Sequence, residues 1–181
     1  MQKVISLRLD GEGESFRTRG MLVKLTWLAV WFGCVLGIDA SEEERILELD
    51  AYWEEVSKVV ANGDWEKYKD ACHPEAVLVS GSKEKSLPMR DILVRWKSEF
   101  DATKAGTRSS KVDFRFSHRY GDEQTAHEAG VFVYSFGVEG EEVKREYVHF
   151  EALLVKKEGR WLLMMEYQKS IATKEEWEKL K

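Results

Sequence analysis

The sequence predicts an α+β domain in which a curved sheet of antiparallel and mixed strands wraps around three N-terminal helices. Residues 142–157 and 160–170 read as two long strands joined by a tight Glu158-Gly159 turn, and a hairpin of that length needs a broad, curved sheet. Three helical patterns precede most of the strands, and helices gathered on one face of an antiparallel sheet define this class. We expect the helices to fill the concave side and to leave a cone-shaped cavity.

The composition is that of a soluble globular protein. The chain has 181 residues, of which 43% are hydrophobic and 34% are charged, and its formal net charge is -5. A nucleic-acid-binding protein would need a clustered basic face, and the sequence has none, so we expect no nucleic-acid partner. Histidines and cysteines lack the spacing of a metal site, and no glycine-rich phosphate loop is present, so we expect neither a metal nor a cofactor.

Residues 1–40 are typical of an N-terminal extension that ends in a signal peptide. Lys24 precedes the apolar run 25–38, and Ala40 is a small residue at a position suited to cleavage. The run is short for a membrane span, which needs about 20 residues. The sequence therefore predicts a bacterial protein that is exported to the periplasm or secreted, with no stable membrane span after cleavage.

The mature domain would span residues 41–181 and would keep Cys72 as its one cysteine, so no internal disulfide could form. Two alternatives to cleavage stay open. The apolar run could remain as a permanent helical anchor, or the chain could be a lipoprotein attached through Cys34. The bulky Trp31 and Phe32 beside that cysteine argue against lipidation.

The mature domain should begin with two helices. Ser41 and Glu44 form a capping box at the start of the first helix, and Asn62-Gly63 ends it. Asp64 would cap a second, short helix, which ends at His73-Pro74 because the residue before a proline avoids helical angles. Five apolar residues spaced three and four apart give the first helix one buried face: Ile46, Leu49, Trp53, Val56 and Val60.

A strand over residues 75–80 and a third helix follow. Ser86 would cap that helix, Pro88 is tolerated in its first turn, and residues 101–110 would form a flexible linker or lid. The buried stripe of the third helix would consist of Met89, Leu93, Trp96 and Phe100.

From residue 111 onward the hydrophobic period is two. Residues 111–120 alternate as a strand, and Gly121-Asp122 turns the chain. Residues 124–137 are apolar on both faces, which indicates a central strand before the long hairpin. Thr173 and Glu176 form a capping box that opens a short C-terminal helix.

The predicted order of helices and strands, together with three short sequence segments, resembles the SnoaL-like branch of the nuclear transport factor 2-like superfamily. The segments are Asn62-Gly63-Asp64-Trp65, His73-Pro74-Glu75-Ala76-Val77 and Lys157-Glu158-Gly159-Arg160-Trp161-Leu162-Leu163. The resemblance covers residues 41–170 and implies a cone-shaped fold with a pocket, and commonly a homodimer through the open sheet face. It does not imply a reaction, because one fold hosts many functions. The isomerase branch places a catalytic aspartate in the first strand, where this chain has Ser80, and that mechanism is therefore disfavoured.

His149 and Glu151 are the strongest candidates for acid–base catalysis. They lie two apart on one strand and so face the same side, which the resemblance places on the concave face. A carboxylate beside an imidazole in an apolar cone would raise the imidazole pKa. The alternative is a solvated or paired structural cluster. The residues predicted to contact a ligand are Trp53, Trp96, Tyr147, Met165 and Tyr167.

Three functions stay open for this sequence. The favoured one is an exported module that binds a small apolar or carbonyl-containing ligand without turnover. The second is a cofactor-free isomerase, dehydratase or cyclase that uses His149 and Glu151. The third is a dimeric assembly module. The second face of the hairpin is apolar and would meet water in a monomer, so we expect it to form a homodimer interface through Val148, Phe150, Leu154, Leu162 and Met164.

Overall fold

The computed structural model describes residues 35–138 and 140–180 of the chain. Six strands form one sheet in the order β2-β1-β6-β5-β4-β3, in which β1 and β6 run parallel and the other neighbours run antiparallel. The predicted α+β class is confirmed. The elements are α1 (Val35–Ala61), α2 (Trp65–Asp70), β1 (Cys72–Ser80), β2 (Lys85–Pro88), α3 (Met89–Lys104), β3 (Arg108–Gly121), β4 (Thr125–Val138), β5 (Lys144–Lys157), β6 (Arg160–Ile171) and α4 (Lys174–Lys179).

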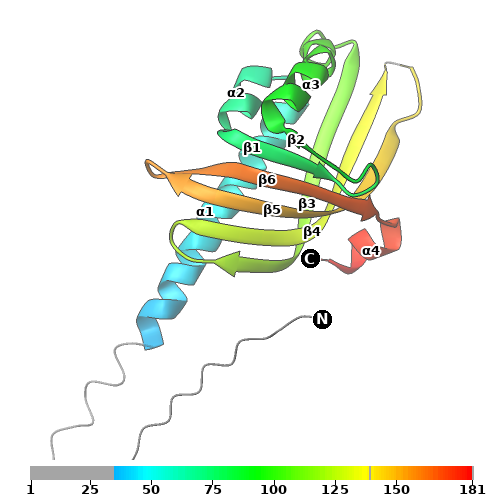
Figure 1. The fold of residues 1–181 in the computed structure, drawn as a ribbon. Helices are drawn as coiled ribbons and strands as arrows, with labels where there is room; N and C mark the ends of the chain where they lie inside the picture. The colour runs from blue at the N-terminus through cyan, green and yellow to red at the C-terminus, as the bar shows by residue number, and fades with distance from the viewer. Residues whose placement is uncertain (1–34, 139, 181) are drawn as a thin grey trace, which may run out of the picture.

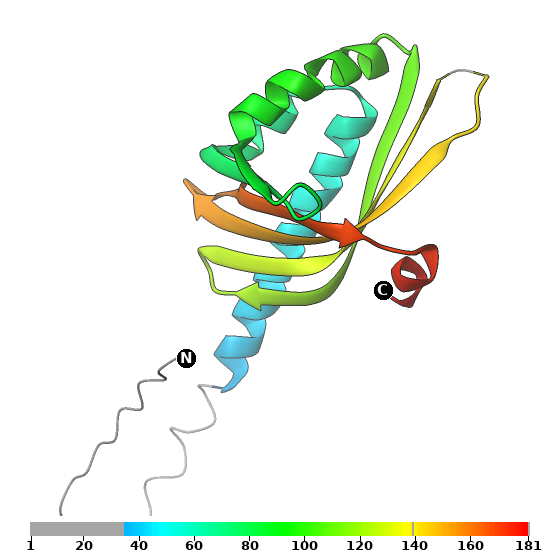
Figure 2. The same ribbon diagram turned by 45° about the vertical axis from the view of Figure 1, so that its right-hand side comes forward.

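The sheet is strongly curved, and α1 crosses its concave side (Figure 1). Figure 1 shows α2 and α3 at the C-terminal end of α1, and Figure 2 shows α4 following the end of β6 on the opposite side from α3. Irregular register between Phe116 and His118 and between Leu153 and Leu154 bends the long strands. Such bulges increase local twist and let a sheet curl around packed helices.

The predicted face of α1 is confirmed, because Leu49, Trp53, Val56 and Val60 are all buried. The predicted start of this helix is wrong: α1 runs Val35–Ala61 without a break, so Ser41 lies inside it and does not begin it. Asp64 caps α2 as expected, and its side chain accepts a hydrogen bond from the backbone N–H of Lys67.

Most of the predicted signal peptide, together with Cys34, lies outside the described residues. Within residues 35–138 and 140–180, no helix combines the length and the apolar character that a membrane crossing requires.

The segment before α3 differs from the prediction. Ser86 does not cap a helix, because it pairs with Val79 in the antiparallel strand β2. Pro88 takes the N-cap position and α3 begins at Met89. The predicted linker over residues 101–110 is instead the last turn of α3, a short turn and the start of β3. A connection of only three residues, 105–107, therefore joins α3 to β3, and this short connection fixes the end of α3 against the sheet.

The predicted faces of β5 are wrong and must be exchanged. Between residues 148 and 154 of β5, the inward side chains are those of Val148, Phe150, Ala152 and Leu154, the last three at no more than 1% exposure. The physical reason is that this set is wholly apolar, so burying it against α1 gains more free energy than burying the mixed alternative.

The outward side of the hairpin carries the side chains that we expected inside. Tyr147, His149 and Glu151 alternate with the buried set and so point away from α1. Met165 and Tyr167 of β6 pair with Leu153 and Glu151 of β5 and share that outward side. The expectation that Val148, Phe150 and Leu154 form an exposed dimer patch is corrected by the same observation, because Phe150 and Leu154 lie in the core and Val148 packs against it from the inner side.

An aromatic cluster forms the centre of the core between α1 and the sheet. Trp53 of α1 contacts Phe114 at a ring-centroid distance of 4.4 Å and Phe150 at 5.9 Å. Phe116 and Phe132 complete the cluster, each within about 6 Å of Phe150. Offset and edge-on ring pairs of this kind stabilise a core beyond the area that they bury. This cluster fills one part of the cone and leaves the part beside α3 open.

Candidate functional site

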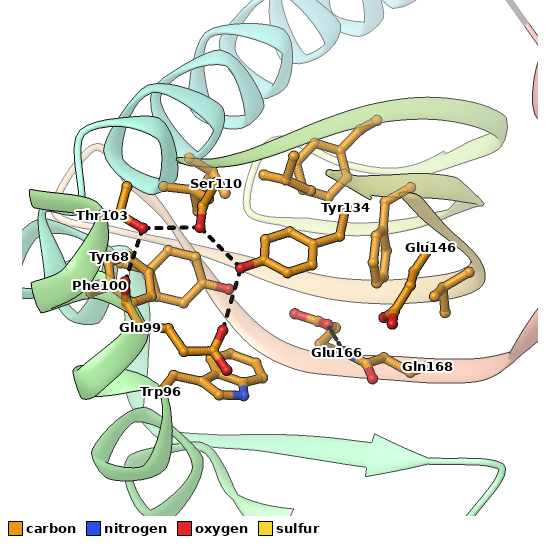
Figure 3. A pocket seen from close by; sticks show the side chains of 16 residues that line it. Tyr68, Trp96, Glu99, Phe100, Thr103, Ser110, Tyr134, Glu146, Glu166 and Gln168 are labelled. Carbon is orange, nitrogen blue, oxygen red and sulfur yellow. Dashed lines mark hydrogen bonds between the residues drawn. The ribbon is translucent and has the colours of Figure 1, made fainter. Parts of the chain in front are cut away.

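A cavity of about 310 Å³ lies between α3 and the inner face of the sheet. That volume falls at the lower end of the range of ~300–1,000 Å³ typical of ligand pockets. Figure 3 shows the side chains around it. The lining residues are Val56, Val60, Tyr68, Trp96, Glu99, Phe100, Thr103, Ser110, Val112, Phe114, Phe132, Tyr134, Glu146, Val148, Glu166 and Gln168.

Aromatic rings from four elements line the cavity. Tyr68 of α2 packs against Phe100 and Trp96 of α3, with ring-centroid distances of 5.3 and 6.2 Å. Tyr134 of β4 and Phe114 of β3 face them across the cavity. Val56 and Val60 of α1 form the apolar floor, because the helix places them one turn apart on its buried face.

A chain of hydroxyl groups ties the end of α3 to the strands beside the cavity. Thr103 and Ser110 approach to 2.9 Å between their hydroxyl oxygens. The Tyr134 hydroxyl lies 3.2 Å from that of Ser110 and 3.4 Å from the carboxylate of Glu99 (Figure 3). Arg108 also pairs with Glu99 at 3.4 Å. These contacts fix the Tyr134 ring at the cavity wall and leave its hydroxyl at the edge of the opening.

Glu166 projects into the cavity from β6, next to Gln168 (Figure 3). Its Oε1 accepts a hydrogen bond of 2.7 Å from the Gln168 amide. The side chain is half-buried because the cavity opens beside it, yet the surrounding protein desolvates the carboxyl. That desolvation raises the pKa of Glu166, since burial disfavours the charged form.

Two tyrosines near the cavity remain protonated at neutral pH. Burial raises the pKa of Tyr68 well above its ordinary value, and the nearby Glu166 carboxylate adds to the effect. Burial does the same to Tyr52, whose hydroxyl donates to the backbone carbonyl of Ala71 at 3.1 Å. Cys72 is free and buried, and desolvation raises the pKa of its thiol to about 12, which makes it inert as a nucleophile.

Of the seven residues that sequence reasoning predicted for the site, Trp96 lines the cavity. Trp53 is 6% exposed and lies in the core, where its indole N–H donates to the carboxylate of Glu128. The remaining five, which include His149 and Glu151, lie on the outer side of the sheet. The acid–base role that we predicted for those two rested on a concave location that they do not have.

The outer side carries its own polar cluster around a hollow bordered by His118, His127 and His149. Glu151 accepts from Lys169 at 2.6 Å and lies 3.2 Å from His127, and these contacts, led by the Lys169 hydrogen bond, lower the pKa of Glu151. His149 pairs at 3.4 Å with Glu176 of α4. His149 and Glu151 thus each have a separate partner. Over residues 35–138 and 140–180, no group of three or more His, Cys, Asp or Glu side chains is arranged to hold a metal ion.

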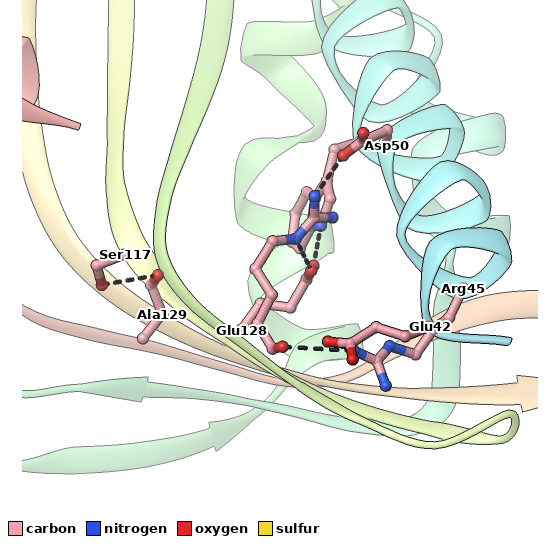
Figure 4. Close-up of polar contacts among 8 residues, drawn as sticks. Glu42, Arg45, Asp50, Ser117, Glu128 and Ala129 are labelled. Atoms are coloured by element: carbon pink, nitrogen blue, oxygen red, sulfur yellow. Dashed lines mark hydrogen bonds and ion pairs between the residues drawn. The ribbon is translucent and has the colours of Figure 1, made fainter. Parts of the chain in front are cut away.

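Sequence reasoning missed Glu166, Glu146 and Glu128, all of which face inward. Glu128 and Glu166 are each followed or preceded by apolar and aromatic residues, which is the signal that could have identified them, whereas Glu146 follows Lys144 and Arg145 and has no such signal. Glu128 is fully buried on β4 and holds Arg119 of β3, which also reaches Asp50 of α1 at 2.5 Å (Figure 4).

Comparison with solved structures identifies relatives of the fold. An NTF-2-like protein of unknown function from Shewanella oneidensis matches with a TM-score of 0.52 and 13% identity over 68% of this chain and 97% of its own. An uncharacterised protein with a cystatin-like fold from Caulobacter vibrioides matches with a TM-score of 0.54 and 13% identity, covering 75% and 95%. The chain has the nuclear transport factor 2-like fold.

Another nuclear transport factor 2-like neighbour is a candidate calcium/calmodulin-dependent protein kinase II association domain from Xanthomonas campestris. It matches with a TM-score of 0.51 and 16% identity, covering 66% of this chain and 83% of its own. Comparison with family models and with curated proteins finds no match. At these identities the likeness establishes the nuclear transport factor 2-like fold and leaves the function to be argued from the cavity.

Proposed function

We propose that this protein binds a small, largely apolar molecule in the cavity between α3 and the sheet. The observation that carries the proposal is the cavity itself: about 310 Å³, walled by aromatic and aliphatic side chains and bordered by a few polar groups. Pockets with this balance are the usual sites of small-molecule binding, because apolar walls supply affinity and a few polar groups fix orientation. Binding without turnover remains the favoured function.

A cavity-filling variant tests this proposal. Val148 lies in the cavity wall on β5, and Val148→Trp would occupy the space that a ligand needs. Val94→Trp is the matched control, because Val94 is 70% exposed on α3 and lies outside the cavity lining. We expect native mass spectrometry of the protein purified from its own host to find a retained small molecule in the parent protein and in Val94→Trp, and none in Val148→Trp. A parent protein without retained mass, or equal retention in Val148→Trp, contradicts the proposal.

We also propose that two copies associate through the outer face of the sheet. Three cross-strand neighbours lie side by side on this face: Val77 of β1 pairs with Met165 of β6, and Met165 pairs with Leu153 of β5. All three side chains are apolar and half-buried. Tyr167 extends this patch beside Val79. An apolar patch on one face of a sheet is typical of a protein interface. The Xanthomonas neighbour is an association domain candidate, which supports the same proposal.

Export is proposed on the sequence alone. The apolar run 25–38 after Lys24 supports a signal peptide cleaved after Ala40, with the mature domain in the periplasm or outside the cell. Expression of the full chain in a bacterial host, followed by fractionation and N-terminal sequencing, tests it. We expect an N-terminus at Ser41 in the exported fraction. An intact N-terminal segment in the membrane fraction would favour an anchor instead.

A further inference from the structure

We propose that the cavity selects small molecules that carry a positively charged amine head on an apolar body, an inference that rests on the cavity being a ligand site. The charge of the lining is the first observation. Three of the residues around the cavity are glutamates, at positions 99, 146 and 166, and the lining contains no lysine, arginine or histidine. Basic residues make up 28 of the 181 residues of the chain, so this one-sided lining does not reflect a shortage of basic side chains.

Glu166 is the anchor of the site. It lies on the inner face of β6, and its Oε1 accepts a hydrogen bond from Gln168. Within the part of the chain that the structure describes, no donor reaches its Oε2 and no cationic side chain pairs with it. A desolvated carboxylate without a cation is costly, and a ligand ammonium would supply both the missing charge and the missing donor.

The other two carboxylates lie toward the opening and have different states. Glu99 is engaged by Arg108 at 3.4 Å and by the hydroxyl of Tyr134, so its charge is partly compensated. Glu146 of β5 has no ion pair among residues 35–138 and 140–180. Figure 3 shows Glu146, Glu166 and Gln168 near one another, away from the side chains of α3. Two uncompensated carboxylates there create a negative potential that attracts a cation and repels an anion.

The aromatic wall favours the same class of ligand. Trp96, Tyr68 and Phe100 present ring faces and edges to the cavity from α2 and α3, and Tyr134 faces them from β4. The face of an aromatic ring attracts an ammonium group, and rings also accommodate an apolar ligand body. A ligand with an amine directed at Glu166 and a compact apolar body against these rings satisfies both features. A carboxylate or phosphate head would meet repulsion from all three glutamates.

Matched probe sets test the inference. Tryptamine, tryptophol and indole-3-acetate share a ring system and differ in the charge of the head, and phenethylamine, 2-phenylethanol and phenylacetate repeat the comparison with a smaller body. We expect isothermal titration and ligand-observed NMR at neutral pH and low salt to find each amine bound at least tenfold more tightly than its alcohol. The carboxylates should bind more weakly than the alcohols.

Glu166→Gln keeps the shape and the hydrogen bond to Gln168 but removes the charge. It should reduce amine affinity by at least tenfold and change alcohol affinity by less than twofold. Glu75→Gln, an exposed carboxylate on β1, is the matched control and should change neither. Alcohols that bind as tightly as the amines, or an amine preference that survives Glu166→Gln, would overturn the amine inference and leave the cavity as a ligand site. If none of the six probes binds and the native protein retains no mass, both proposals fail together.

Discussion

Buried charge at single residues decides much of the stability of this protein. Glu128 is fully buried and holds the Trp53 indole N–H and the Arg119 guanidinium. Glu128→Ala would leave both donors without this partner inside the core. Removing one member of a buried charged pair typically costs about 3–5 kcal/mol, because the other charge stays desolvated. We expect a loss of unfolding free energy of that size in urea denaturation, whereas the exposed Glu123→Ala should change it by less than about 0.5 kcal/mol. A small effect of Glu128→Ala would show that water replaces the carboxylate.

For Glu166 we expect the opposite effect on stability from that of Glu128, so that removing its charge stabilises the folded state. The reason is that desolvation favours the neutral form of Glu166 and raises its pKa. A carboxyl group with a raised folded-state pKa contributes stability that is fully present below the unfolded value of ~4.3 and is lost as the pH rises through the folded value. Glu166→Gln has no charge to desolvate. We therefore expect it to melt at a higher temperature than the parent at pH 7 to 8, with a gap that closes as the pH falls toward ~4.

Thermal denaturation across that pH series is the measurement, and Glu75→Gln is the surface control for Glu166→Gln. A difference in melting temperature that is independent of pH, or a variant that melts lower than the parent at pH 8, would mean that the Glu166 carboxylate does not destabilise the folded state. The same carboxylate that would bind an amine thus costs stability when the cavity is empty, which is a common cost of a functional site.

At the scale of elements, Gly63 sets how closely the loop after α1 approaches α3. Its φ is 64°, and a Cβ added there would lie 2.4 Å from the backbone of Phe100 and Lys104. Gly63→Ala combines the cost of a left-handed conformation with a backbone clash, and we expect a loss of about 2–4 kcal/mol. Because Phe100 and Thr103 line the cavity, displacement of α3 should also weaken ligand retention.

Gly106 provides the control for that variant. Its φ is 77°, so alanine there also adopts a left-handed conformation, but nothing lies within 4 Å of the added Cβ. Gly106→Ala should therefore lose only about 1–2 kcal/mol and keep its ligand. Chemical denaturation and native mass spectrometry of both variants separate the two costs, and equal losses would show that the close approach at Gly63 does not matter.

The sequence predicted the elements of this fold better than it predicted the faces that they bury. Period-two alternation identified the long strands, and the Glu158-Gly159 turn matches two consecutive positive φ angles, 53° and 75°. Alternation alone cannot say which face is inside, because both faces of β5 contain apolar side chains. The resemblance favoured the face with His149 and Glu151, although the alternating set Val148, Phe150, Ala152 and Leu154 on the other face is wholly apolar. The short strand β2 was missed because its pairing with β1 is set by tertiary contacts and not by local pattern.

The cavity is a property of the whole molecule, and so the sequence did not reveal it. Trp96 of α3, Tyr134 of β4 and Glu166 of β6 are far apart in the chain and meet only when the sheet curls around α1. The strand bulges and the three-residue connection between α3 and β3 determine where the cone stays open. None of these is a local motif. The fold class followed from the order of elements, whereas the site depends on how far each strand bends.

The cavity and the apolar patch on the outer face lie on opposite sides of one sheet, which predicts that binding and association are independent. Leu153 lies in that patch, and Leu153→Glu would place a charge opposite Met165 in the proposed interface. We expect the variant to run at half the parent mass in native mass spectrometry, because an unpaired charge buried between copies is costly. It should keep the retained small molecule, since Leu153 does not line the cavity. Leu47→Glu, at a position 70% exposed on α1, should keep the parent mass. A Leu153→Glu protein of unchanged mass would exclude this patch as the interface, and one that loses its ligand would show that association shapes the cavity.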